Sequence, residues 1–198
     1  ISHDGVKTRS AGRCGLGAVM GSKLLKAIVV SGSGEHNTPQ AKPDELRAGL
    51  PKAIKQIKER LNVFGKVGTP GGVQNYEGLG NLPLKNWAEA CAPELAAKTT
   101  GTELLDRLVT GRTGCKHCPI HCGRMVKITE GPYALTCEQE GPEYETVAGF
   151  GSLCMVDDLE AISKANELCN QLGLDTISMA GVASFAMEAV EKGIITSE

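Results

Sequence analysis

The sequence has no strong charge excess, no long apolar run and few aromatic side chains. Its formal net charge is −2 and its pI is about 6.1, so electrostatics give no reason to expect a nucleic-acid partner. No apolar stretch approaches the roughly 20 residues that span a bilayer, and we expect no membrane span. Aromatic residues make up 4% of the chain, and its single tryptophan, Trp87, is predicted to anchor the core.

The sequence also lacks a signal peptide and the regular cysteine spacing of a secreted disulfide scaffold. Its eight cysteines are therefore expected to be thiols in a reducing cytoplasm, available for metal or redox chemistry. With 41% hydrophobic residues over 198 positions, the chain can bury the core of one or two domains. It begins at Ile1 rather than at a methionine, and we expect it to be an internal part of a longer protein.

Three cysteines lie close together in the run Cys115-Lys-His-Cys118-Pro-Ile-His-Cys122. Three soft sulfurs in one loop favour an iron–sulfur cluster or zinc over magnesium or calcium. Both kinds of centre normally take four protein ligands, so the fourth must come from another segment or from His117 or His121. The spacing alone leaves cluster, zinc and unligated thiols open.

A glycine-rich segment over residues 10–32 precedes a polar linker over residues 32–44. Its glycines at 12, 15, 17 and 21, with Arg13 and Lys23 nearby, suit a loop that binds phosphate through backbone amides, although tight turns packed on a sheet would look the same. A β-branched run predicts a strand at about residues 26–31, and the linker marks a domain boundary.

The remainder of the chain is predicted to be mostly helical. Apolar periodicity predicts helices over residues 46–61, 102–109 and 157–173, with Pro51 interrupting the first helix, Asp157 capping the third and Gly173 ending it. Residues 174–178 are predicted to turn the chain into a last helix that runs to about residue 192 and ends at Gly193. Residues 65–73 are predicted to be loop, and residues 124–129 and 133–137 to form a hairpin. The last helix is apolar nearly all round, so it should be largely buried, in part by the remainder of a longer protein.

Four segments together resemble one family, the aldehyde:ferredoxin oxidoreductases, which are tungsten-pterin enzymes. The segments are Gly12-Arg-Cys-Gly-Leu-Gly-Ala-Val-Met-Gly-Ser-Lys23, Cys115-x2-Cys118-Pro-Ile-x-Cys122-Gly-Arg124, Gly141-Pro-Glu-Tyr-Glu-Thr146 and Leu172-Gly-Leu-Asp-Thr-Ile-Ser178. Their order and spacing carry the resemblance over almost the whole chain.

The resemblance implies a tungsten (or molybdenum) bis-pterin beside a 4Fe-4S cluster, with magnesium as a candidate bridge between the pterin phosphates. Family members oxidise aldehydes to carboxylates and pass electrons through the cluster to ferredoxin. Cys115, Cys118 and Cys122 would be three of the cluster ligands, with the fourth beyond Glu198. Cys137, Cys154 and Cys169 are alternatives, but a small buried side chain is the simpler expectation for each.

The resemblance also implies roles for residues around the tungsten. Glu145 would be the active-site glutamate, with a pKa raised by burial, and Glu143 is a weaker candidate. Cys14 and Asn170 depart from the family's usual glycine and aspartate. The expected pterin contacts come from two segments: Arg13, Gly15, Leu16, Gly17 and Ala18 in the first, and Asn170, Gly173, Leu174 and Asp175 in the second.

The expected fold is α+β, with residues 1–41 as the end of a β-rich pterin-binding domain and residues 42–198 as an incomplete, largely helical second domain. Expected partners are ferredoxin, a small aldehyde, the remaining domains and further copies in an oligomer. This chain alone should not retain tungsten. A benzoyl-CoA reductase-type subunit of the same superfamily and a structural zinc module remain as alternatives.

Overall fold

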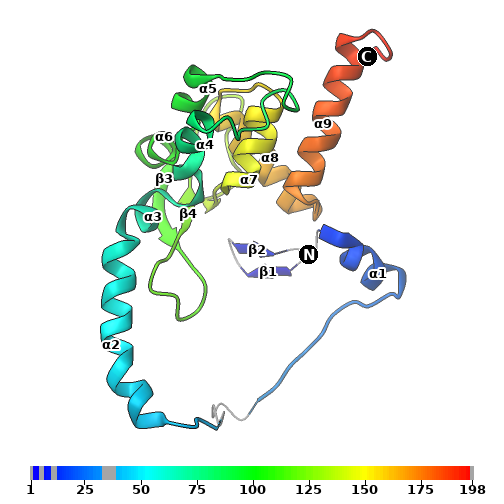
Figure 1. The fold of residues 1–198 in the computed structure, drawn as a ribbon. Helices are drawn as coiled ribbons and strands as arrows, with labels where there is room; N and C mark the ends of the chain where they lie inside the picture. The colour runs from blue at the N-terminus through cyan, green and yellow to red at the C-terminus, as the bar shows by residue number, and fades with distance from the viewer. Residues whose placement is uncertain (1, 5–6, 10–12, 33–38, 197–198) are drawn as a thin grey trace.

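In the computed structural model, a helical body carries a small antiparallel sheet, and two segments extend from it (Figure 1). The structure describes residues 2–4, 7–9, 13–32 and 39–196. The predicted α+β class, with a largely helical second part, is confirmed. None of the described helices is both long and apolar enough to cross a membrane.

The elements follow one another in a simple order. The helices are α1 (Leu16–Ser22), α2 (Pro43–Arg60), α3 (Asn62–Val67), α4 (Val73–Gly78), α5 (Pro93–Lys98), α6 (Gly101–Arg107), α7 (Tyr144–Thr146), α8 (Leu159–Leu172) and α9 (Thr176–Glu191). Two 3-10 turns, η1 (Arg13–Gly15) and η2 (Thr69–Gly72), and a π-helix, η3 (Val147–Leu153), complete them. The strands are β1 (Ser2–Asp4), β2 (Lys7–Arg9), β3 (Val109–Thr113), β4 (Gly123–Val126) and β5 (Gln139–Glu140).

The predicted strand over residues 26–31 is wrong, because this segment has no regular structure. Ile28, Val29 and Val30 are 70%, 90% and 88% exposed. A strand needs a neighbour for its backbone hydrogen bonds, and the described part of the chain supplies none here. The glycine at 12 and residues 33–38 of the predicted linker lie outside the described residues.

Helix α2 forms at the predicted positions, but Pro51 lies inside it without ending it. The helix has no buried residue and extends away from the body (Figure 1). The predicted loop over residues 65–73 is wrong, because α3, η2 and the start of α4 occupy it. Pro70 sits in the first turn of η2, where its missing N–H costs nothing.

The core consists of two clusters of apolar side chains between the short helices and the sheet. The first contains Val73, Leu82, Leu84, Leu95, Ala96, Val147 and Ile162, and the second Leu104, Leu108, Val126, Ile128 and Leu159. Trp87 belongs to neither and is 64% exposed, so its prediction as a core anchor is wrong. Its backbone has φ 59° in a run of three left-handed residues that begins at Lys85, which turns it out of the core.

The predicted hairpin between residues 124–129 and 133–137 is also wrong. Strand β4 pairs with β3 on one side and with β5 on the other, both antiparallel. Thr113 lies opposite Gly123 at the end of the β3–β4 pair where the chain passes from one strand to the other. The loop between these two residues is therefore the cysteine loop, residues 114–122.

The last two helices have defined caps. Asp158, not Asp157, caps α8, since its Oδ1 accepts the N–H groups of Glu160 and Ala161, while Asp157 pairs with Lys98. Gly173 ends α8 with φ 72° as predicted, because that conformation favours glycine.

Helix α9 is not largely buried within this chain. Only Ala180 and Ala189 are buried, whereas Val182 and Phe185 are 60% and 74% exposed. The face of α9 that carries Ala180 packs closely against the π-helix η3. The approach is so close that a Cβ added to Gly149 would lie 2.7 Å from Cβ of Ala180. The opposite face has nothing over it among the described residues.

Buried Glu167 on α8 ties that helix to the sheet. Its Oε1 accepts hydrogen bonds from the Thr136 N–H, the Thr136 hydroxyl and the Gln139 amide, and its Oε2 lies 2.6 Å from Lys164 Nζ. Burial raises the pKa of this carboxyl, but the Lys164 and Thr136 hydrogen bonds outweigh it and the pKa is lowered. The ionised form is therefore the one that stabilises the fold.

Replacing Glu167 by Gln should lower the free energy of unfolding by about 1–3 kcal/mol near neutral pH, because a charged acceptor is lost from a buried network. Folding lowers the pKa of Glu167, so the difference in unfolding free energy between wild type and variant is largest above the ordinary glutamate pKa of 4.5. It decreases as the pH falls through the pKa of Glu167 in the folded protein. Urea unfolding across pH 3–7 would measure it. Glu160→Gln on the same helix is the control, because it removes an exposed ion pair with Arg107, and it should change the unfolding free energy little. Equal effects of the two substitutions would contradict the stabilising role of the Glu167 network.

Candidate metal and cofactor site

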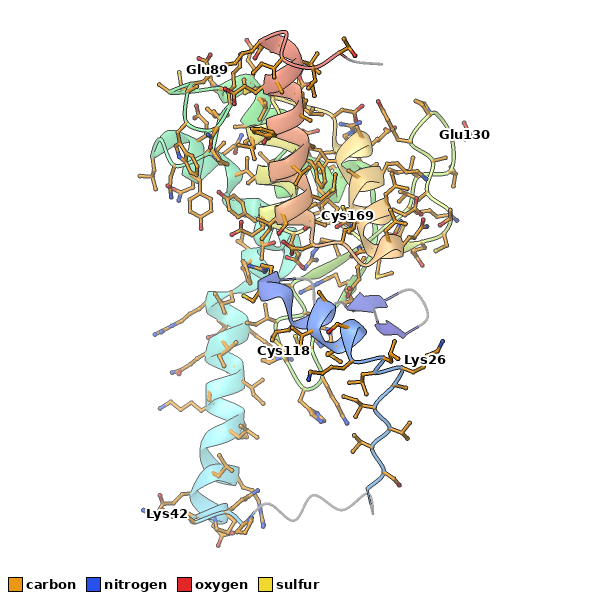
Figure 2. The ribbon with its side chains drawn as sticks, turned by 90° about the vertical axis from the view of Figure 1, so that its right-hand side faces the viewer. Lys26, Lys42, Glu89, Cys118, Glu130 and Cys169 are labelled. Carbon is orange, nitrogen blue, oxygen red and sulfur yellow. The ribbon has the colours of Figure 1, made fainter. Side chains whose placement is uncertain are left out.

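The three predicted metal-ligating cysteines lie on the loop between β3 and β4. Cys115 is exposed, whereas Cys118 and Cys122 are partly buried, and Figure 2 shows Cys118 below the helical body. The Cys118 N–H donates to the Cys115 carbonyl, which closes a turn between the first two thiols. His117 and His121 both have positive φ, 64° and 51°, a strained conformation of the kind that gathers at functional sites.

Two arginines on the strands that flank the loop bind its backbone. Arg124 on β4 donates from Nη2 to the carbonyl oxygens of His121 (2.9 Å) and Gly65 (2.8 Å), and from Nε to that of Cys122 (3.3 Å). Arg112 on β3 donates from Nη2 to the Ile120 carbonyl at 2.7 Å. Three consecutive loop carbonyls, those of residues 120–122, are thus fixed by guanidinium groups.

The electrostatics of the loop are unusual for a surface hairpin. Burial, followed by the Glu143 carboxylate and the two other loop thiols, raises the pKa of Cys122. Burial and the neighbouring Arg112 lower the pKa of Arg124. Arg124 is only 3% exposed, and two buried donors here, Arg124 Nη1 and Thr113 Oγ1, have no hydrogen-bond partner in the described part of the chain.

These residues fit a sulfur-ligated centre in their chemistry, since three thiols and two unpaired buried donors meet at one loop. The described residues contain no group of three His, Cys, Asp or Glu side chains already close enough to hold one metal ion. The loop therefore supplies ligand atoms of the right kind. In the described residues, these atoms are not yet arranged around one point.

The Gly141–Thr146 motif lies between the cysteine loop and the helical body. Glu143 caps α7 with extended φ/ψ, and its carboxylate accepts a hydrogen bond from Thr69 on η2. The same carboxylate acts electrostatically on Cys122 and Arg124. Glu143 is thus a structural link between α7 and η2, and its charge acts on the loop.

Glu145 is exposed on α7, so the burial expected from sequence is absent in this chain. Helix α7 contacts η2, η3 and α9, and the charge of Glu145 helps to raise the pKa of Tyr144, after burial of that phenol. Within the described residues its carboxylate makes no hydrogen bond or ion pair. A carboxylate in this state can take part in chemistry, in contrast to that of Glu143.

Two segments predicted to contact the pterin are brought together. Arg13 Nε lies 3.6 Å from Asp175 Oδ1 at the start of α9, although 162 positions separate them. Asp175 Oδ2 meanwhile accepts the Ser178 N–H and hydroxyl as the cap of α9. Next to it, the hydroxyls of Thr176 and Thr146 are 2.9 Å apart and join α9 to the Glu145 helix.

The other predicted pterin-contacting residues lie around this ion pair. Gly15, Leu16 and Ala18 are exposed and Gly17 is partly buried, at the start of α1. Cys14 has φ 60°, a conformation that favours the glycine expected there from the resemblance. Asn170 is partly exposed at the end of α8, and the Gly173 and Leu174 N–H groups bond to the carbonyls of Asn170 and Cys169.

The remaining cysteines separate into core and surface positions. Cys154 and Cys169 are buried, and the Cys154 thiol donates to the Ala180 carbonyl at 3.9 Å. Figure 2 places Cys169 within the body on α8. These two behave as small core side chains, while Cys14, Cys91 and Cys137 are exposed.

Sequence reasoning missed the residues that hold the site together. Arg112 lies between Gly111 and Thr113 on β3, and Arg124 follows Gly123 on β4. Only the β3–β4 pairing shows that the two arginines flank one loop. Arg124 was visible as part of the cysteine motif, two positions after Cys122. Thr69 and Thr176 gave no signal in the sequence.

Comparison with known proteins gives one consistent result. The family model for aldehyde ferredoxin oxidoreductase, domains 2 and 3, matches residues 45–198, and that for the N-terminal domain matches residues 1–32. A tungsten-containing aldehyde ferredoxin oxidoreductase of Pyrococcus furiosus is 38% identical over 202 residues, which cover 100% of this chain and 32% of that protein. One from Thermococcus kodakarensis is 36% identical, with the same coverage of each chain.

A more distant relative is named for a different substrate. The WOR-like subunit of an aliphatic sulfonate oxidoreductase from Pyrococcus furiosus is 30% identical over 196 residues, which cover 96% of this chain and 30% of that protein. The chain spans about a third of the length of the relatives it matches.

Gly68 offers a test of how the loop is held. It has φ 69° and ψ −164°, and a Cβ there would lie 2.8 Å from the Cys122 carbonyl oxygen and 3.2 Å from Arg124 Nε. Gly68→Ala should lower the free energy of unfolding by about 1–3 kcal/mol, since the backbone is strained and the loop must move. Thermal or urea unfolding measures this.

Gly80→Ala is the control, because Gly80 also has positive φ, 66°, but nothing lies within 4 Å of its added Cβ. Labelling of Cys122 by a thiol reagent should become faster in Gly68→Ala and stay unchanged in Gly80→Ala. Unchanged labelling in both would mean that Gly68 does not position the loop.

Proposed function

Since the chain belongs to the aldehyde ferredoxin oxidoreductase family, we propose that the protein containing it oxidises aldehydes to carboxylic acids and passes the electrons through a 4Fe-4S cluster to ferredoxin. One observation supports this most: α7, which carries Glu145, is hydrogen-bonded to α9 through Thr146 and Thr176, the adjacent Asp175 pairs with Arg13, and Glu143 at the start of α7 acts electrostatically on Cys122.

The cysteine loop would hold the cluster. Cys115, Cys118 and Cys122 supply three thiolates, and the fourth ligand comes from another part of the longer protein. When bound, the cluster provides one-electron transfer. A structural zinc module is not favoured by the named relatives, which are oxidoreductases.

The Arg13–Asp175 region would hold a tungsten bis-pterin, with molybdenum as the chemically related alternative. Arg13 and the amides of Gly15, Leu16, Gly17 and Ala18 suit the phosphates, together with a bridging magnesium ion. The Asn170 carbonyl and the backbone at Gly173, Leu174 and Asp175 suit the pterin ring. Because Asn170 carries no charge, its contact is weaker than that of a carboxylate.

Glu145 would move a proton during the reaction. Aldehyde oxidation adds an oxygen from water and releases protons and electrons, so a carboxylate beside the substrate can accept a proton. Its exposure in this chain supports this role, provided that the cofactor and the remaining domains cover it in the longer protein. Burial there would raise its pKa toward the range that suits a proton acceptor.

The proposal includes the wider organisation. Residues 1–41 end the pterin-binding domain and residues 42–198 form most of the helical one, and the exposed face of α9 meets the remaining domains. The protein is cytoplasmic and oligomeric, and the isolated chain does not retain tungsten. A benzoyl-CoA reductase-type role is not favoured by the named relatives.

The first test is the metal content of the full-length protein, purified without oxygen, and of its Cys118→Ala variant. The wild type should contain tungsten and about four iron atoms and give a reduced-cluster EPR signal. Cys118→Ala should lose most of the iron and the signal, whereas Cys91→Ala, an exposed thiol outside the loop, should lose neither. Zinc alone in the wild type would refute the proposal.

The second test is Glu145→Gln in the same protein. Aldehyde oxidation should fall by about 10²–10⁴-fold in kcat, because the proton acceptor is lost, while tungsten and iron contents stay unchanged. Glu143→Gln should instead reduce loop stability. If the wild type converts aliphatic sulfonates or benzoyl-CoA but no aldehydes, the family assignment would stand and the proposed aldehyde substrate would be wrong.

A further inference from the structure

Arg112 and Arg124 face each other across the β3–β4 pair, directly beside the cysteine loop. Their Cα atoms are register partners in the antiparallel ladder. Like charges in directly opposed positions destabilise a sheet, so this pairing is unfavourable unless negative charge lies near it. Both side chains turn toward the loop, as their hydrogen bonds to residues 120–122 show.

The two guanidinium groups differ in environment. Arg112 is exposed, whereas Arg124 is 3% exposed and packs under the loop against Gly65. Glu143 acts electrostatically on Arg124, but its carboxylate already accepts a hydrogen bond from Thr69. No ion pair to Arg124 occurs in the parts of the chain that are described, so its charge is only partly compensated.

One donor of the buried group is still available. Nε and Nη2 of Arg124 bind three carbonyl oxygens, but Nη1 is buried without a partner. A buried charged donor without an acceptor is costly and calls for an explanation. The sulfurs of a centre held by Cys115, Cys118 and Cys122 would supply acceptors on the same loop that Arg124 binds, and they would bring negative charge.

We propose that Arg124 is a positioning residue for the cluster, which fixes the Cys122 end of the loop through backbone carbonyls and donates a hydrogen bond from Nη1 to a cluster or cysteine sulfur. This inference rests on the proposed function, since it requires the cluster on the loop. A cation and an N–H donor near the sulfurs stabilise the more negative, reduced cluster. Arg124 therefore raises the reduction potential of the cluster.

The test is an EPR-monitored redox titration of the full-length protein with Arg124→Gln, Arg124→Lys and Arg112→Gln. Arg124→Gln should shift the reduction equilibrium at least tenfold toward the oxidised cluster, which is ~59 mV for a one-electron couple. Arg124→Lys should shift it less, because the charge remains while the fork of donors is lost. Arg112→Gln should shift it least, since solvent screens an exposed charge.

Each result bears on the inference separately from the proposed function. A wild type without iron and acid-labile sulfide refutes the proposed function. A wild type with the cluster, together with an Arg124→Gln variant of unchanged iron content and potential, overturns the inference alone. Equal shifts in Arg124→Gln and Arg112→Gln also overturn it, because they would indicate general charge rather than a buried donor.

A measurement on the wild type covers the case in which the Arg124 variants fail to fold. Arginine labelled with a nitrogen isotope at its guanidinium should give a weak magnetic coupling to the reduced cluster in pulsed EPR. The coupling should persist in Arg112→Gln, which excludes Arg112 as its source. Its absence from the wild type would refute the hydrogen bond from Arg124.

Discussion

The arrangement of this site depends on a buried arginine beneath a loop of cysteines. Arg124 binds the carbonyls of Gly65, His121 and Cys122, so it joins α3, the cysteine loop and β4 in one hydrogen-bonded group. Close glycine contacts make this possible, because a side chain at Gly65 or Gly68 would collide with the loop or with its arginines. Burial of the guanidinium is unfavourable in itself, and its backbone hydrogen bonds offset only part of that cost.

The same group connects the loop to the remainder of the candidate site. Glu143, bound to Thr69, sets the start of α7 next to Cys122, and Thr146 joins the end of α7 to Thr176. Asp175 then caps α9 and pairs with Arg13. Motifs far apart in sequence are therefore brought together around α7, which carries Glu145.

The exposed surfaces agree with the short span of the chain relative to its relatives. The β-branched segment at residues 28–30, the apolar side of α2 and the outer face of α9 are all uncovered within the described residues. Local sequence favours strand or amphipathic helix in each case, but stability of such elements comes from burying the apolar face. Helices formed here because their hydrogen bonds are internal, whereas the strand did not form because its hydrogen bonds require a neighbour.

The sequence by itself determined the family, through motifs whose order and residue types do not depend on packing, and it determined the long helices, since α8 and α9 follow from periodicity and from Gly173 and Gly193 at their ends. It also identified Cys115, Cys118 and Cys122 as candidate ligands, because soft donors at close spacing need no tertiary information. Only the tertiary structure decided that the cysteine loop joins β3 to β4, that Arg124 lies buried beneath it, and that Arg13 meets Asp175. These are non-local contacts between segments up to 162 positions apart. Local patterns of residues carry no information about which distant segments come into contact.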